Sequence, residues 1–168
     1  FIVPKNVQTI KREAFRNCAA LDTVNISEAT TDISPEAFKN CSNLKAINVS
    51  KKNSVYSSVD GYLLSQNKKT LIIFPPGKAN DRFTLLPPSI TSIGKYAFYD
   101  CKNLKNVTIP NLVTSIGERA FGLCTNLKTI TFLCDEKIKE DSINKEENKM
   151  SFDDGTQTSH NMFQNINI

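Results

Sequence analysis

Five cysteines and a single histidine carry the most versatile chemistry in this 168-residue sequence, and their spacing limits what they can do. No two of the cysteines form the close C-x-x-C pair of a metal site; they are Cys18, Cys41, Cys101, Cys124 and Cys134. His160 stands near the end of the sequence without a Cys–His, Ser–His or H-E-x-x-H arrangement around it. We therefore expect no catalytic residue, no metal ligand and no cofactor site, and predict that the chain is not an enzyme.

Carboxylates cluster in two short segments, CDEKIKED (134–141) and SFDDGTQ (151–157). Neither has the length and closing glutamate of an EF-hand loop, so an adventitious cation is the most we expect them to hold. Cys134 adjoins the first cluster and is the most reactive thiol that we expect, but its carboxylate neighbours disfavour a thiolate there. The dipeptides Asp60-Gly61 and Pro76-Gly77 indicate turns, with no phosphate-binding motif around them.

Most of the cysteines belong to an internal repeat. Residues 91–110 and 114–133 are identical at eleven of twenty positions, at a constant offset of 23. An Ala-Phe pair recurs four times, each followed by a cysteine, a leucine and two apolar residues spaced as in a strand. The pairs are Ala14-Phe15, Ala37-Phe38, Ala97-Phe98 and Ala120-Phe121. A fixed period of this length predicts a repeat solenoid, in which each repeat forms one coil.

Each repeat is expected to combine short extended pieces with one tight turn. Residues 107–109 alternate apolar and polar side chains and read as a strand, which Pro110 ends. The segment VTSIG (113–117) reads as a second, shorter strand, and ERAFGLC (118–124) as a single helical turn with its apolar residues on one face. One such unit cannot bury its own apolar side. Stacked copies can do so, with parallel strands about 4.8 Å apart.

Stacking would bring the cysteines of adjacent coils together, Cys18 with Cys41 and Cys101 with Cys124. Strand spacing places such pairs within the Cα separation of a disulfide, about 4.4–6.8 Å. Free cysteine is also among the most buried residue types and fills small apolar spaces. We favour buried free thiols behind the phenylalanines, with disulfides as the alternative.

The repeated pattern L-x-x-[IV]-x-I-P-x-x-V-T-S-I-G-x-x-A-F-x-x-C-x-N resembles the BspA-like (Treponema pallidum-type) leucine-rich repeat over roughly residues 1–134. The resemblance implies a curved right-handed solenoid with a concave parallel β-sheet, and short helical turns or short strands on the convex side. Tyr56–Lys78 resembles the variant segment that such proteins place between regular coils. Within it, GYLL (61–64) and TLIIF (70–74) predict a β-hairpin, one strand of which extends the sheet.

These patterns divide the sequence into two regions. Residues 1–134 are expected to form the repeats, with an irregular hairpin-containing segment at about 50–83. Residues 135–168 are expected to be a charged insertion, followed by a degenerate terminal repeat at Met162–Ile166. Because the sequence starts and stops within a repeat, we expect either a piece of a longer repeat protein or termini that cap the coils themselves.

Side chains between the buried strand residues should point outward and form polar columns across the coils. The candidate ligand-binding residues on this concave face are Thr23, Asn25, Lys45, Asn48, Lys105, Asn106, Thr108, Lys128, Thr129 and Thr131. Any solenoid needs a polar outer face, so these columns are typical either of solvation alone or of a binding surface. Four N-x-[ST] sequons also occur, and a glycan at three of them would cover this face; they are Asn25, Asn40, Asn48 and Asn106.

Charge and hydropathy exclude several other classes of protein. The net charge of +4 divides into +8 for residues 1–134 and −4 for residues 135–168, with no basic run longer than a pair. A nucleic-acid interface is therefore not expected. No apolar run approaches the roughly 20 residues that span a bilayer, so we expect no membrane insertion. The opening FIVPKNVQTI has no signal-peptide pattern, so the terminus does not reveal the compartment.

The resemblance implies a role at the cell surface. Relatives of this kind are typically surface proteins of host-associated bacteria and of some protists, so we expect a non-catalytic interaction module of a secreted or cell-surface adhesin-like protein. It would bind a protein ligand, of the host or of the matrix, through the concave face. The alternative is a structural stalk that spaces another part of a larger surface protein.

Overall fold

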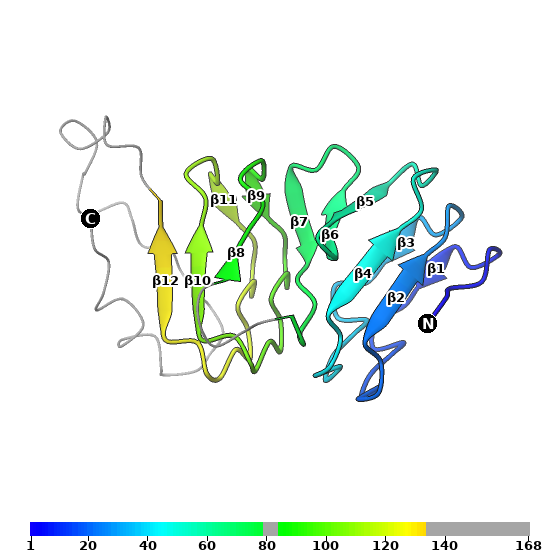
Figure 1. The fold of residues 1–168 in the computed structure, drawn as a ribbon, viewed down its shortest axis with the longest axis horizontal. Helices are drawn as coiled ribbons and strands as arrows, with labels where there is room; N and C mark the ends of the chain where they lie inside the picture. Colours follow the sequence, from blue (N-terminus) through cyan, green and yellow to red (C-terminus); the bar gives the residue numbers. More distant parts are fainter. Residues whose placement is uncertain (79–83, 134–168) are drawn as a thin grey trace.

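The computed structural model describes residues 1–78 and 84–133, which form about five stacked coils. Its strands are β1 (Thr9–Ile10), β2 (Thr23–Ile26), β3 (Asp32–Ile33), β4 (Ala46–Val49), β5 (Tyr56–Val59), β6 (Tyr62–Ser65), β7 (Thr70–Ile73), β8 (Thr84–Leu85), β9 (Ser92–Ile93), β10 (Asn106–Ile109), β11 (Ser115–Ile116) and β12 (Thr129–Phe132). Figure 1 shows β1–β4 at one end, β5–β7 in the middle and β8–β12 at the other end. The described residues form no helix, and so none that could cross a membrane.

Strands of successive coils pair in parallel, which confirms the solenoid. In the four-residue strands, β2 pairs with β4 and β10 with β12, and Val24 lies opposite Ile47 as Val107 lies opposite Ile130. The two-residue strands pair in the same way, β1 with β3 and β9 with β11. β8 joins β10 with Thr84 opposite Val107, so the 23-residue register continues through β8.

The Ala-Phe segments form turns, and the expected helical turns are absent from the described residues. In every copy the residue before the cysteine has a positive φ: Asn17, Asn40, Asp100 and Leu123 lie between 59° and 63°. In three copies the residue before the alanine is also left-handed, as at Arg119 (φ 51°). Left-handed residues break the run of right-handed dihedrals that a helix requires, so the apolar face forms on a turn instead.

Each coil with the Ala-Phe-x-x-Cys turn binds the phenylalanine of the coil before it, which explains the spacing of that motif. The backbone N–H of Phe98 donates to the carbonyl of Ala120 at 2.7 Å, and the Cys124 thiol donates to the Phe98 carbonyl at 3.0 Å. The same two bonds join Phe15 to the second coil, at 2.9 Å each. The phenylalanine rings of these adjacent coils also stack, and the ring centroids of Phe98 and Phe121 lie 4.7 Å apart. Ring stacking and backbone hydrogen bonds thus both fix the position of the same residue, the phenylalanine of the Ala-Phe pair.

The middle of the chain confirms the hairpin and adds a strand that the sequence analysis did not predict. β6 pairs antiparallel with β7, and β5 pairs antiparallel with β6 through a tight turn at Asp60 and Gly61. Both turn residues have positive φ, 51° and 79°, as a two-residue hairpin turn requires. β7 then pairs in parallel with β9, so the hairpin extends the sheet of short strands and not that of the long strands.

β6 and β7 also divide the interior into two cores and contribute to both. Leu63 and Ile73 lie opposite each other and pack into the core of the first two coils. Leu64 and Leu71 are the next pair and pack into the core of the last two coils. Side chains alternate along a strand, so a hairpin buried on both faces explains the continuous apolar runs GYLL and TLIIF.

The phenylalanine stack gives a direct test of this packing. Phe98 is fully buried, with Phe74 at 4.9 Å and Phe121 at 4.7 Å, so Phe98→Ala should lower the free energy of unfolding by roughly 3–5 kcal/mol. Phe15→Ala is the matched control, because Phe15 stacks in the same way but stays partly exposed, and it should lose clearly less. Urea unfolding followed by circular dichroism measures both. Equal losses for the two variants would contradict the account.

Candidate functional site

The first polar patch lies on β2 and β4. Thr23 and Asn25 alternate with buried residues along β2, and register places Asn25 opposite Asn48 on β4. The amide of Asn48 donates from Nδ2 to Oδ1 of Asn25 at 3.2 Å, and Lys45 stands exposed just before β4. We call Thr23, Asn25, Lys45 and Asn48 the N-terminal patch.

The second polar patch lies on β10 and β12. Asn106 and Thr108 alternate with buried residues on β10, and register places them opposite Thr129 and Thr131. Lys105 and Lys128 precede these strands and are joined through their backbones, since the Lys128 N–H donates to the Lys105 carbonyl at 2.8 Å. We call Lys105, Asn106, Thr108, Lys128, Thr129 and Thr131 the C-terminal patch. Every candidate residue of the sequence analysis thus belongs to one of two patches.

The two patches do not form the continuous columns that the sequence analysis expected. β2 and β4 form one sheet, whereas β8, β10 and β12 form another. The edge of β4 is met by the turn of the β5–β6 hairpin, because the Ile47 N–H donates to the Gly61 carbonyl at 2.8 Å. A Cβ on Gly61 would lie 2.8 Å from that of Ala46, so only glycine fits there. The irregular coil therefore interrupts the long-strand sheet between the patches (Figure 1).

The four described cysteines are free thiols, and three of them pack in the interior. Cys41, Cys101 and Cys124 are buried, whereas Cys18 is exposed, so the expectation of a buried thiol is wrong for Cys18. Burial raises the pKa of the Cys41 thiol to about 11. Burial, together with the neighbouring Cys124, also raises the pKa of Cys101. Cys41 and Cys101 therefore stay protonated at neutral pH, and a protonated thiol is a poor nucleophile.

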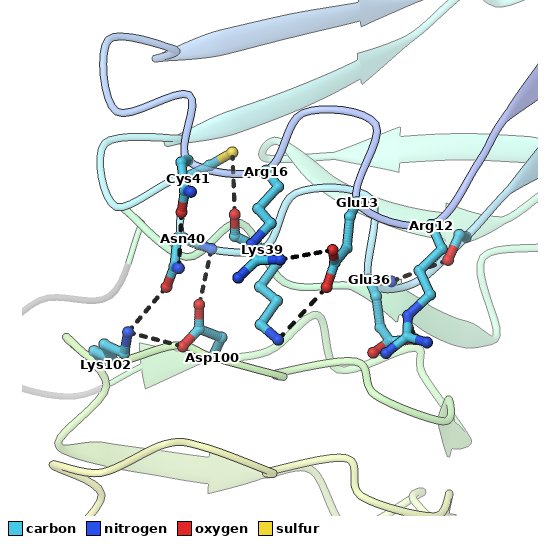
Figure 2. Close-up of polar contacts among 11 residues, drawn as sticks. Arg12, Glu13, Arg16, Glu36, Lys39, Asn40, Cys41, Asp100 and Lys102 are labelled. Carbon is cyan, nitrogen blue, oxygen red and sulfur yellow. Dashed lines mark hydrogen bonds and ion pairs between the residues drawn. The ribbon is translucent and has the colours of Figure 1, made fainter.

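A polar cluster that the sequence analysis missed joins the second and fourth coils across the irregular one (Figure 2). The Asn40 N–H donates to Oδ2 of Asp100 at 2.8 Å, and Lys102 donates from Nζ to Oδ1 of Asn40 at 2.9 Å. In a regular coil the equivalent N–H donates to a backbone carbonyl of the next coil, as Asn17 does to Lys39 at 3.0 Å. The side chain of Asp100 replaces that carbonyl.

The same turn edge carries a row of ion pairs, also drawn in Figure 2. Glu13 lies 3.0 Å from Arg16 and 3.6 Å from Lys39, and the pKa of Glu13 is lowered by the hydrogen bond and charge of Arg16 against the opposing effect of burial. Arg12 and Glu36 form a further pair at 3.1 Å. The two arginines are exposed, whereas Glu13, Glu36 and Lys39 are partly buried, so the pairs cover the surface of the turns and join the first coil to the second.

Two of the sequon asparagines, Asn40 and Asn48, form side-chain hydrogen bonds to the preceding coil. Asn40 donates from Nδ2 to Oδ1 of Asn17 at 2.9 Å, and the Nδ2 of Asn48 is bonded to Asn25. A glycan on either nitrogen would compete with these bonds. Several further expectations fall on residues outside the described ones, namely Cys134, His160, the two acidic segments and the terminal repeat at Met162–Ile166.

Comparison with protein families identifies the repeat. The model of the BspA type leucine rich repeat region matches residues 1–81 and 78–168, in six copies. The chain belongs to this family. A search of curated proteins finds no match.

Solved structures share the fold. A leucine-rich repeat protein from Eubacterium ventriosum is 26% identical, with a TM-score of 0.61 over 80% of this chain and 42% of its own. A leucine rich cell surface protein from Faecalibacterium prausnitzii is 26% identical, with a TM-score of 0.57 over 77% and 42%. The pneumococcal vaccine antigen PcpA is 24% identical, with a TM-score of 0.54 over 66% and 29%. The chain therefore spans less than half the length of each.

The account of the cysteines can be tested by alkylation. In the native protein at pH 8, iodoacetamide should modify the exposed Cys18 and leave Cys41 and Cys101 unmodified, because both thiols are buried. Raising the pH to about 9.5 should not make Cys41 reactive, since its pKa is about 11. Mass spectrometry of the peptides gives the extent at each site, with urea-unfolded protein as the control. Rapid labelling of Cys41, or a peptide in which Cys18 and Cys41 are linked, would contradict free, buried thiols.

Proposed function

We propose that this chain is a non-catalytic protein-interaction module of a secreted or cell-surface, adhesin-like repeat protein. It binds a protein ligand, of a host surface or of the extracellular matrix, through the N-terminal and C-terminal patches. The leucine-rich-repeat architecture supports a binding role, because stacked coils give a rigid surface on which outward side chains keep a fixed spacing. Fold alone does not define a ligand, so the proposal depends on the chemistry of the patches.

The C-terminal patch carries the proposal furthest. Its four strand residues form two adjacent cross-strand pairs of hydrogen-bonding side chains, Asn106 with Thr129 and Thr108 with Thr131. Lysines flank them at Lys105 and Lys128. Hydroxyls and amides held at strand spacing suit the polar groups of a protein ligand, while the lysines favour an acidic ligand surface.

The family and its solved members support the cellular setting. One structure of similar fold is described as a leucine rich cell surface protein. We extend that setting to this chain as part of the proposal, because the chain spans less than half of that protein. The competing proposal is a stalk, in which the coils only space other parts of a larger surface protein.

Surface substitutions separate a binding module from a stalk. Lys128→Glu combined with Thr131→Ala should weaken binding to a matrix protein at least tenfold, because one cation and one hydroxyl are lost from the C-terminal patch. Lys45→Glu combined with Asn48→Ala tests the N-terminal patch in the same way. Biolayer interferometry against purified fibronectin, fibrinogen, laminin and collagen measures the affinities.

Lys11→Glu provides the matched charge control, because Lys11 is exposed and follows β1, away from both patches. This variant should bind as the unaltered chain does, apart from the weak effect of net charge. All variants should keep the same unfolding midpoint, since the substituted side chains lie at the surface. Affinity that survives both patch variants, or no affinity for any matrix protein, would favour the stalk.

A further inference from the structure

A pocket of about 230 Å³, lined mainly by polar residues, opens beside the irregular coil. Its lining residues come from the second, third and fourth coils: Asn40, Ser42, Pro76, Asp100, Lys102 and Asn103. We call it the junction pocket. Figure 2 shows Asn40, Asp100 and Lys102 converging at this place. Its volume corresponds to about eight waters at roughly 30 Å³ each, which is the size range of one small polar ligand.

The pocket exists because the irregular coil lacks groups that a regular coil supplies. Pro75 and Pro76 follow Phe74 where a regular coil has residues with backbone N–H groups, and proline has none. In the regular coils the asparagine two residues after the cysteine bonds to the preceding coil, Asn43 to the Ala19 carbonyl at 2.7 Å and Asn126 to the Lys102 carbonyl at 2.8 Å. No such bond is made by Asn103 within the described residues.

Asp100 places an unsatisfied acceptor in the wall of this pocket. Its side chain is 1% exposed, and Oδ2 is bonded to the Asn40 N–H. Lys102 Nζ lies 3.1 Å from Oδ1 as an ion pair, but at an angle that forms no hydrogen bond. Among the described residues, Oδ1 is the one buried side-chain oxygen or nitrogen that lacks a hydrogen bond. Buried polar atoms are nearly always hydrogen-bonded, so such an exception calls for a partner.

The lining restricts the chemistry of that partner. An anion would meet the Asp100 carboxylate, and a cation would meet the Lys102 ammonium that already compensates it. The described residues hold no group of three or more potential metal-ligating side chains. An apolar ligand would desolvate five polar lining residues against only Pro76. Once anions, cations and apolar ligands are excluded, the class of ligand that fits the pocket is a neutral molecule with closely spaced hydrogen-bond donors and acceptors.

We propose that the junction pocket binds one sugar ring of a saccharide. One hydroxyl donates to Oδ1 of Asp100, and neighbouring hydroxyls bond to Lys102, Asn103 and Ser42. Lys102 is 55% exposed, so its side chain turns outward to admit the sugar while keeping its contact with solvent. Pro76 supplies the apolar wall of the pocket for the sugar ring.

A titration followed by ¹⁵N NMR tests this site. The probes are the methyl glycosides of glucose, galactose, mannose and N-acetylglucosamine, with inorganic phosphate and methylammonium as charged comparisons. At least one glycoside should bind saturably and shift the amides of Ser42 and Asn103. Ser42→Ala and Asn103→Ala should weaken binding roughly three- to tenfold each, the effect of one lost hydrogen bond. Asp100→Asn should weaken it further, because its acceptor becomes neutral.

Ser42→Ala and Asn103→Ala separate a loss of binding from a loss of stability. Ser42 and Asn103 are exposed and make no side-chain hydrogen bond within the described residues, so their variants should unfold as the unaltered chain does. Thr125→Ala is the matched control, since Thr125 takes the place of Ser42 in the last coil, and it should leave binding unchanged. The site is overturned if no glycoside binds, if only phosphate or methylammonium binds, or if the pocket variants bind glycosides unaltered.

Discussion

The rest of the structure depends on one constraint, which is that no coil can bury its own apolar side. Where a coil with the Ala-Phe-x-x-Cys turn follows another coil, the chain meets this constraint with two hydrogen bonds to the phenylalanine backbone, as at Phe15, Phe74 and Phe98. The alanine carbonyl and the cysteine thiol of one coil bind the backbone of the phenylalanine in the coil before, as at Phe98. Both partners must come from the same turn, and this fixes the Ala-Phe-x-x-Cys spacing. Cys41, Cys101 and Cys124 serve as small buried donors, and burial raises the pKa of Cys41 and Cys101.

The irregular coil has to satisfy this constraint on two sides. Toward the fourth coil Phe74 donates to the Ala97 carbonyl at 2.7 Å and its ring stacks on Phe98. Pro76 has no N–H, so the bond that Asp100 makes to the Gly122 carbonyl of the next coil is missing there. Toward the second coil it has no cysteine, since Gly77 stands at that position. Packing of Leu63 and Ile73, the bond from the Gly77 N–H to Leu44, and the carboxylate of Asp100 take over there. The junction pocket and the separation of the strand patches both result from this substitution.

Much of the fold could be predicted from the sequence, because the 23-residue period sets strand register directly. The pairing of Val107 with Ile130 and the hairpin over residues 61–74 follow from local patterns. The conformation of the turns could not be predicted in this way. Arg119 and Leu123 have left-handed backbone dihedrals, although neither arginine nor leucine favours that conformation. The candidate patches could be listed by residue, but their separation depends on how the irregular coil packs. The bond between Asp100 and Asn40 could not be predicted, because the sequence shows only that Asp100 occupies the position of Asn17 and Asn40 in two other repeats.

The central claim is that the irregular coil joins the two halves as firmly as one regular coil joins the next. Native-state hydrogen exchange of three backbone amides tests it: Phe98 in a regular coil, Phe74 in the irregular coil, and Asn40 bonded to Asp100. The account predicts that Phe74 and Asn40 open with free energies close to that of Phe98. Exchange of Phe74 and Asn40 near the rate of an unstructured peptide, with Phe98 still protected, would contradict it.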